Sequence, residues 1–231
     1  VSKVRLRPLS QGEITGTLPN FLTYVFAQSF DFQWKFYEKE AIVDMAFRGG
    51  FPEILTLERQ DRKKWHKDYI DALLERDLRD VAAINKYDAM GELITILAAW
   101  SSKFMDLSSI ASGLSIRRPT VEAYLNALEA LYLVETVSPW TKTDYGRIGK
   151  QQKLFMTDSG LMSSLLAWKS DQIKFDSDRL GKLMETFIFN ELAAQIDASN
   201  GEYELYHYRD REKREIDFLI EREDQSLLGI E

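Results

Sequence analysis

The stretch Glu215-Ile216-Asp217-Phe218-Leu219-Ile220 alternates acidic and apolar side chains, which is typical of a half-buried β-strand. Strict alternation would place Ile216, Phe218 and Ile220 on one face of a sheet and both carboxylates on the other. Acidic residues are depleted in strand interiors, so Asp217 is a candidate functional residue. A helix predicted over residues 180–196 and strands predicted over 204–208 and 227–231 surround this stretch, which indicates an α/β module.

Three carboxylates of this module point to a cation site. Glu185 lies on the first turns of the predicted helix, Asp217 in one strand, and Glu231 at the end of the next. Divalent cations such as Mg²⁺ take oxygen ligands from carboxylates and complete their shell with water and phosphate. We therefore expect Glu185, Asp217 and Glu231 to converge on one Mg²⁺ or Mn²⁺ and to act as catalytic and metal-binding residues. The alternative is that Asp217 and Glu231 are surface acids paired with Arg209 or Arg214.

The middle of the chain has the pattern of a winged helix. Helices are predicted over 90–104, 107–114 and 119–133, and strands over 134–140 and 153–157. The loop between the strands is basic, whereas the whole chain carries a net charge of −7, so any DNA contact must be local. The predicted contacts are Arg117 and Arg118 at the recognition helix and Lys142, Arg147 and Lys150 on the wing. The alternative is a solvated loop whose charges serve solubility.

The first part of the chain is predicted to be largely helical. Residues 4–7 are predicted to form a short strand that ends at Pro8, and Ser10 and Glu13 have capping-box spacing. A strand this near the first residue suggests that the chain begins inside a domain. Helical segments follow over residues 20–58, interrupted at 48–52, and one long amphipathic helix is predicted over 59–84.

Composition excludes several kinds of protein. The chain has no cysteine, which excludes disulfides and thiolate metal sites and is compatible with the cytoplasm. No apolar run approaches the roughly 20 residues of a membrane span, so no membrane partner is expected. No glycine-rich P-loop motif occurs, and this chain alone is therefore not expected to hydrolyse ATP.

Several segments together resemble a family of predicted AAA-type P-loop ATPases that end in the domain of unknown function 4143. They are residues 7–13, 48–53, 154–161, 181–185, 208–209 and 215–218. The resemblance implies that the P-loop lies upstream, so that ATP would be bound only through a missing N-terminal ATPase domain, itself a partner of this chain. It also implies that Arg48, Gly50 and Pro52 belong to a lid motif beside the nucleotide. A plain helix break is the alternative for these residues.

The order Glu185, Asp217, Glu231 on a helix followed by strands also resembles the PD-(D/E)xK nuclease superfamily. The lysine of that motif would fall two residues after Glu231, outside this sequence. The expected fold is mixed α and β and multi-domain. It comprises an ATPase remnant with its helical lid over residues 1–85, a winged helix over 86–160, and a truncated restriction-endonuclease-like α/β domain over 161–231.

Two functions are compatible with these patterns. The chain is either the DNA-associated C-terminal portion of an ATPase with a nuclease-like metal-binding module, or a catalytically silent regulatory or protein-interaction domain of that ATPase. Separately, Glu191 falls within the apolar stripe of the helix at 180–196. A buried carboxylate must be paired, so we expect it to contact Arg209 or a backbone amide.

Overall fold

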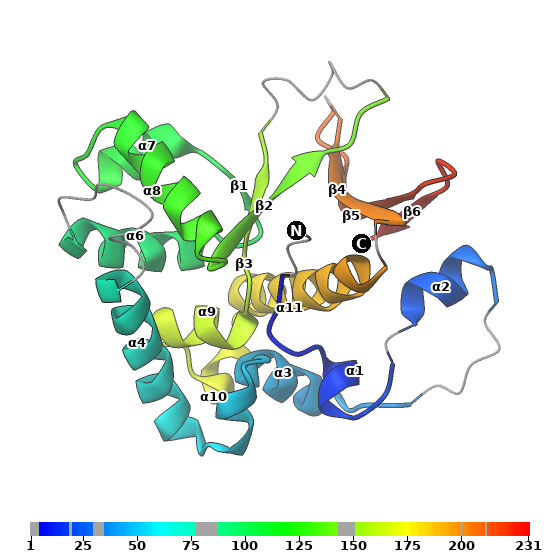
Figure 1. The fold of residues 1–231 in the computed structure, drawn as a ribbon, viewed down its shortest axis with the longest axis horizontal. Coiled ribbons are helices and arrows are strands. Elements are labelled where there is room, and N and C mark those ends of the chain that lie inside the picture. The colour runs from blue at the N-terminus through cyan, green and yellow to red at the C-terminus, as the bar shows by residue number, and fades with distance from the viewer. Residues whose placement is uncertain are drawn as a thin grey trace.

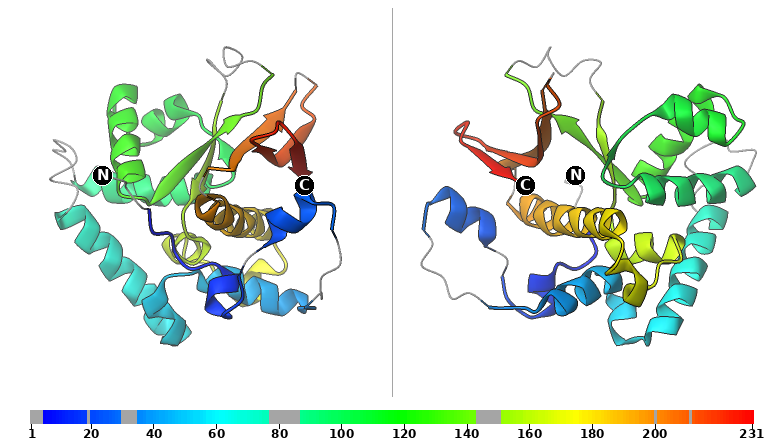
Figure 2. Two further views of the ribbon diagram at one scale, coloured as in Figure 1. Left: turned by 45° about the vertical axis from the view of Figure 1, so that its right-hand side comes forward. Right: turned by 180° about the vertical axis from the view of Figure 1, so that it is seen from behind.

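The computed structural model describes residues 5–18, 20–29, 35–76, 87–142, 151–199, 201–210 and 212–231. The fold is mixed α and β, as expected, with a six-stranded mixed sheet. Figures 1 and 2 show the long helix α11 (Ser177–Ala198) beneath the sheet, with α1 (Gln11–Ile14), α3 (Lys39–Arg48), α9 (Ser159–Leu165) and α10 (Ser170–Ile173) on its other side. The structure therefore has a sheet, a central helix and a helical layer.

The other elements largely follow the predicted order, but the helix predicted over 90–104 ends at Trp100, and its last two residues form a short strand instead. The helices are α2 (Phe21–Phe26), the 3-10 helix η1 (Pro52–Thr56), α4 (Arg59–Arg76), α6 (Tyr87–Trp100), α7 (Leu107–Gly113) and α8 (Arg118–Ala130). The strands are β1 (Lys103–Phe104), β2 (Val134–Pro139), β3 (Lys153–Met156), β4 (Tyr203–Arg209), β5 (Glu215–Arg222) and β6 (Leu227–Ile230). Residues 77–84 of the helix predicted over 59–84 lie outside the described residues.

The sheet has the order β1-β3-β2-β4-β5-β6. Only β2 and β4 pair in parallel, through Ser138 with Tyr206 and Pro139 with His207, whereas the other neighbours are antiparallel. The helices α6, α7 and α8 and the antiparallel strands β1, β3 and β2 form an arrangement typical of a winged helix. The sheet continues from these strands into β4–β6, so it runs across the boundary expected at residue 160.

Aromatic side chains hold α11 against the sheet. Phe155 of β3 stacks on Phe189 of α11 with ring centroids 4.4 Å apart and contacts Phe218 of β5 at 5.7 Å. All three side chains are buried. Aromatic burial of this kind supplies much of the free energy that fixes a helix on a sheet, and here it holds α11 against β3 and β5.

A β-bulge in β5 overturns the strict alternation expected there. Tyr206 pairs with Leu219 and Tyr208 with Ile216, so Asp217 and Phe218 together lie opposite the single residue His207. Beyond the bulge the side chains exchange faces. Ile216 and Leu219 both lie beside Gly229, whereas Phe218 packs toward α11. The bulge therefore places Asp217 on the same face as Phe218 instead of the opposite one.

The N-terminal segment does not form the predicted strand. Residues 5–7 have no strand conformation, and Val4 lies outside the described residues. The alternating arginines instead form ion pairs, because Arg5 and Arg7 both contact Glu135 of β2 at 2.8 and 2.9 Å. The capping box is confirmed, since the Ser10 hydroxyl accepts from the Glu13 amide and the Glu13 carboxylate accepts from the Ser10 amide.

Two glycines end α3 beneath the first turn of α9. Gly49 has a φ of +76°, and the amide of Gly50 donates to Asp158 Oδ2 at 2.7 Å. Asp158 also accepts from the amide of Leu161 at 2.6 Å, and burial raises its pKa to about 6. The helix break predicted at residues 48–52 is present, and its two glycines allow α3 to pack closely against α9.

None of the helices in the described ranges combines the length and apolar character that a membrane span needs.

Candidate carboxylate and lysine site

Three carboxylates converge on the ammonium group of Lys153, the first residue of β3. Lys153 Nζ lies 2.8 Å from Glu185 Oε1 on α11, 2.7 Å from Glu215 Oε1 and 2.8 Å from Asp217 Oδ1 on β5. The Lys153 side chain is 2% exposed, whereas the carboxylate side chains are 20%, 31% and 35% exposed. The ammonium is therefore enclosed, while the carboxylates keep an edge toward solvent.

Tertiary contacts from three elements build this cluster. Lys153 pairs with Phe104 of β1 and Val137 of β2, so its strand is covered on both sides. The Lys153 ammonium lies 5.6 Å from the centre of the Phe104 ring, an arrangement that favours the charged form. The bulge in β5 directs Asp217 toward α11, where Glu185 meets it. The site depends on register and packing more than on local sequence.

The charges of the cluster are strongly coupled. Burial alone would lower the pKa of Lys153, but hydrogen bonds to Asp217, Glu185 and Glu215 outweigh burial, and the pKa is raised. Burial raises the pKa of Glu185, and the hydrogen bond from Lys153 only partly offsets this effect. Arg209 Nε lies 3.9 Å from Glu215 Oε2 and adds a second positive charge at the rim. Three carboxylates thus face two cations, which leaves a small negative excess.

The structure brings together two of the three predicted metal ligands. Glu185 and Asp217 contact the same nitrogen, so their nearest oxygens are at most about 5.6 Å apart. Glu231 is exposed and follows Ile230, which packs on the inner face with Phe218. Strand alternation then directs Glu231 to the outer face. Glu215, and not Glu231, supplies the third carboxylate that contacts Lys153.

Sequence reasoning missed both Glu215 and Lys153. Glu215 is adjacent to the bulge, and a bulge has no clear signature in a single sequence. Lys153 ends the basic loop, and the apolar residues after it, Leu154-Phe155-Met156, indicate a buried strand that begins at the lysine. A lone cation at the start of such a strand needs a partner, and this was the available signal.

The donor set fits a divalent cation, but the space is taken by the ammonium. Carboxylate oxygens are the ligands that Mg²⁺ and Mn²⁺ prefer. The three oxygens lie 2.7–2.8 Å from Lys153 Nζ, whereas Mg²⁺ needs oxygens at about 2.1 Å. Across the described ranges, no three acidic or histidine side chains are preformed as a metal site. Cation binding here would require Lys153 to move aside.

The residues predicted to lie beside a nucleotide are divided between two environments. Gly50 is buried, and its carbonyl accepts from the Leu9 amide at 2.7 Å, so its backbone groups are engaged within the protein. Pro52 is exposed at the start of η1. Arg48 donates to Gln11 Oε1 at 3.1 Å and lines a cleft of about 1550 Å³ between α3, α4 and the α9–α10 region.

This cleft is rich in positive charge. Its basic lining residues are Arg48, Arg59, Arg62, Lys63, Lys169 and Lys174, and its acidic ones are Asp44, Glu58 and Asp171. The pKa of Arg62 is lowered by burial and then by repulsion from Arg48. An excess of cations that repel one another favours an anionic ligand.

The predicted DNA contacts are only partly described. Arg117 and Arg118 are exposed at the start of α8, where Arg118 Nε forms an exposed ion pair with Glu122 at 3.1 Å. Lys142 is also exposed. Arg147 and Lys150 lie outside the described residues.

Glu191 has the backbone partner expected for it. Its carboxylate accepts from the amide of Gln11 at 2.9 and 3.1 Å, at the first turn of α1. Burial raises the pKa of Glu191 to about 7, and Glu13 adds a smaller repulsion. This contact ties the N-terminal segment to α11, and it explains a carboxylate on an otherwise apolar stripe.

The fold and this site define a mixed α/β protein in which a buried lysine of β3 contacts one carboxylate of α11 and two of β5. The chain belongs to the family described as Domain of unknown function (DUF8612), which matches residues 39–172, more than half of its length. Residues 180–231, which include Glu185, Glu215 and Asp217, match a second family, Domain of unknown function (DUF4143). The second match supports the resemblance noted in the sequence.

Two curated relatives are similar over a long stretch. Uncharacterized proteins of Mycobacterium bovis (strain ATCC BAA-935 / AF2122/97) and Mycobacterium tuberculosis (strain ATCC 25618 / H37Rv) are each 30% identical over 179 residues. The alignment covers 75% of this chain and 39% of each relative, so the chain spans less than half of their length. No solved structure matches the chain significantly.

Proposed function

We propose that this chain is the C-terminal portion of a AAA-type ATPase and that its last module binds a divalent cation as nuclease-like domains do. The convergence of Glu185, Glu215 and Asp217 on one point carries the proposal. The match of residues 180–231 supports the ATPase part, because the matched domain usually accompanies AAA ATPases. A bound Mg²⁺ or Mn²⁺ would supply Lewis-acid chemistry toward a phosphodiester at this site.

Lys153 is central to this proposal. The nuclease motif needs a lysine next to its acids, and Lys153 reaches both Glu185 and Asp217 from β3. We infer that it takes the role of the motif lysine from a different strand. When the cation is absent, its ammonium neutralises the carboxylates. When the cation is present, Lys153 would hold the third carboxylate or face the substrate phosphate.

A second candidate function is favoured by the same contact. Lys153 already compensates the carboxylates without any metal, which is what a catalytically silent regulatory or protein-interaction module would need for stability. The two functions differ in one measurable property. Only the first requires the carboxylates to exchange the ammonium for a divalent cation.

Millimolar Mn²⁺ is expected to raise the melting temperature of this protein, because a ligand that binds the folded state preferentially stabilises it by mass action. At a concentration of about 100 times the dissociation constant the gain would be roughly 2.7 kcal/mol. Asp217→Ala and Asp217→Asn should both abolish the rise. Differential scanning fluorimetry with and without chelator measures it.

The matched control is Asp224→Asn, which removes an exposed carboxylate outside the cluster. It should leave the response to Mn²⁺ unchanged. Glu231→Gln tests the third ligand expected from the sequence, and a normal response would exclude Glu231 as a ligand. A wild-type protein that shows no response to Mn²⁺ would favour the silent module.

We also propose that the chain binds DNA through the exposed cations of the winged-helix arrangement. The Arg117→Ala, Arg118→Ala and Lys142→Ala triple variant is expected to weaken duplex binding similarly for all sequences. Its salt dependence should flatten by about 0.9 for each phosphate that the protein no longer neutralises. Fluorescence anisotropy over a salt series measures the slope.

Lys213→Ala, in the exposed turn between β4 and β5, is the control and should keep the wild-type slope. An unchanged slope in the triple variant would exclude this surface.

A further inference from the structure

We propose that a cavity between α4, α6 and α9 binds a small molecule with an apolar body and an anionic head group. The cavity has a volume of about 520 Å³, within the range of small-molecule sites and far larger than ordinary packing voids. It lies away from the carboxylate cluster, on a different set of helices. The inference therefore stands apart from the function proposed above.

One part of the cavity is apolar. Ile70 and Leu74 come from α4, Ile94 from α6 and Leu165 from α9, and the first three are buried core residues. Gly91 of α6 also lines the cavity, and apart from its chain neighbours and its own helix backbone no atom lies within 4 Å of the position where a β-carbon would stand. A glycine inside a helix costs about 1 kcal/mol relative to alanine, and here it leaves space that a side chain would occupy.

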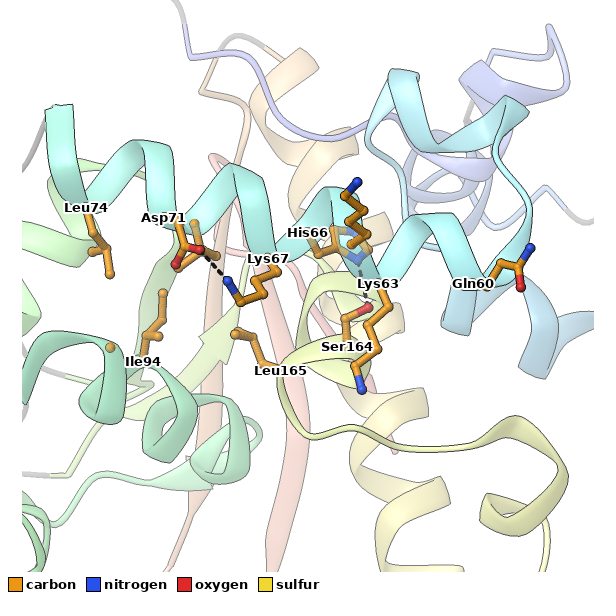
Figure 3. A pocket seen from close by; sticks show the side chains of 12 residues that line it. Gln60, Lys63, His66, Lys67, Asp71, Leu74, Ile94, Ser164 and Leu165 are labelled. Carbon is orange, nitrogen blue, oxygen red and sulfur yellow. Dashed lines mark hydrogen bonds and ion pairs between the residues drawn. The ribbon is translucent and has the colours of Figure 1, made fainter. Parts of the chain in front are cut away.

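The other part of the cavity is polar and basic. In Figure 3, Leu74 and Ile94 lie toward one end, whereas Lys63 and Ser164 lie toward the other. Lys67 is neutralised by Asp71, whose Oδ2 is 2.8 Å from its ammonium (Figure 3). Lys63 forms no ion pair with the described residues, and neither does Lys64. Two ammonium groups that have no ion-pair partner within the described ranges thus border the apolar part of the cavity.

His66 and Ser164, which also line the cavity, do not contribute to its positive charge. His66 is 2% exposed, and its Nδ1 lies 2.7 Å from Ser164 Oγ. Burial, with a smaller contribution from Arg62, lowers the pKa of His66 to about 4, so the ring is neutral near pH 7. Its Nε2 has no hydrogen-bond partner among the described residues. The neutral imidazole therefore does not attract an anion, and the lysines would provide that attraction.

The polar end continues into the large basic cleft. Gln60, Lys63 and Ser164 line both spaces, so the cavity opens where Arg59 and Arg62 also gather. A ligand with its apolar body among Ile70, Leu74 and Ile94 would therefore direct its head group toward a positive field. Carboxylate and phosphate heads share this chemistry.

Isothermal titration calorimetry with dodecanoate, dodecyl phosphate, dodecanol and dodecyltrimethylammonium, all below micelle formation, tests the proposal. We expect the two anionic probes to bind at least about tenfold more tightly than the cationic one, because only their head groups carry a charge opposite to that of the lysines. The ratio between dodecanoate and dodecyl phosphate distinguishes the two head groups. Equal affinity for all four probes, or no binding of any, would overturn the proposal.

Gly91→Leu fills the cavity and is expected to abolish binding of both anionic probes. Gly181→Leu is its matched control, because Gly181 also lies in a helix with nothing within 4 Å of its β-carbon position but is outside the cavity. The Lys63→Glu, Lys64→Glu double variant changes exposed groups and should keep the fold. It should weaken dodecanoate binding by about tenfold or more while leaving dodecanol binding unchanged. Dodecanoate binding that survives both changes would place the ligand elsewhere.

Discussion

Replacing Lys153 by methionine is expected to lower the free energy of unfolding by about 3 kcal/mol near neutral pH. This is the lower end of the range for removing one partner of a buried ion pair, because the carboxylates remain partly exposed. Without the ammonium, Glu185, Glu215 and Asp217 would repel one another. Methionine keeps much of the apolar volume of the lysine stem, so the variant tests the charge.

Urea unfolding of both proteins measures this loss, and two further variants define its cause. Lys67→Met removes an exposed lysine whose pair with Asp71 is 75% and 53% exposed, and it should leave the free energy of unfolding nearly unchanged. Glu185→Gln with Asp217→Asn in the Lys153→Met background should recover most of the stability. If it does not, the loss comes from packing and not from charge.

The loss caused by Lys153→Met is expected to shrink as the pH falls. Burial already raises the pKa of Glu185, and without the hydrogen bond from Lys153 this folded-state pKa would rise further above its unfolded value. A raised carboxyl pKa favours the folded state below the unfolded pKa of about 4, and this contribution disappears as the pH rises through the folded value. Mn²⁺ should also stabilise this variant more than the wild type, because no ammonium competes. A loss that stays constant with pH would contradict an electrostatic cause.

Gly160→Ala is expected to lower the free energy of unfolding by about 2–3 kcal/mol, because an added methyl group in a tightly packed region must displace its neighbours. A β-carbon at Gly160 would lie 2.4 Å from the carbonyl oxygen of Arg48 and 2.8 Å from the amide nitrogen of Gly49. Both are backbone atoms of the turn that Asp158 holds through Gly50. The contact between α3 and α9 would have to open.

Gly181→Ala is the matched control for this change. Gly181 also lies in a helix, but nothing lies within 4 Å of its β-carbon position. Alanine should therefore stabilise α11 by roughly 0.5–1 kcal/mol through helix propensity alone. Opposite signs for the two variants in urea unfolding would support the close contact at Gly160. A stabilising effect at both positions would show that α9 and α3 are not packed as described.

Local patterns in the sequence were sufficient to predict most of the elements. Helical periodicity, the capping box at Ser10 and Glu13, and the apolar strand runs each depend on residues a few positions apart. The same local logic identified Glu185 and Asp217 as unusual carboxylates, and of the two partners expected for Glu191, Arg209 or a backbone amide, the structure has the amide. These are properties that a segment carries with it wherever it packs.

The site itself required tertiary structure. The bulge at Asp217 exchanges the faces of β5, and it depends on the register between β4 and β5. Lys153 meets Glu185 across 32 positions and Asp217 across 64, and neither distance in sequence has a periodic signal. Arg5 and Arg7 likewise resembled a strand because their partner, Glu135, is remote in the sequence. Alternation and periodicity describe neighbours along the chain, whereas ion pairs and cavities arise only when distant segments pack together.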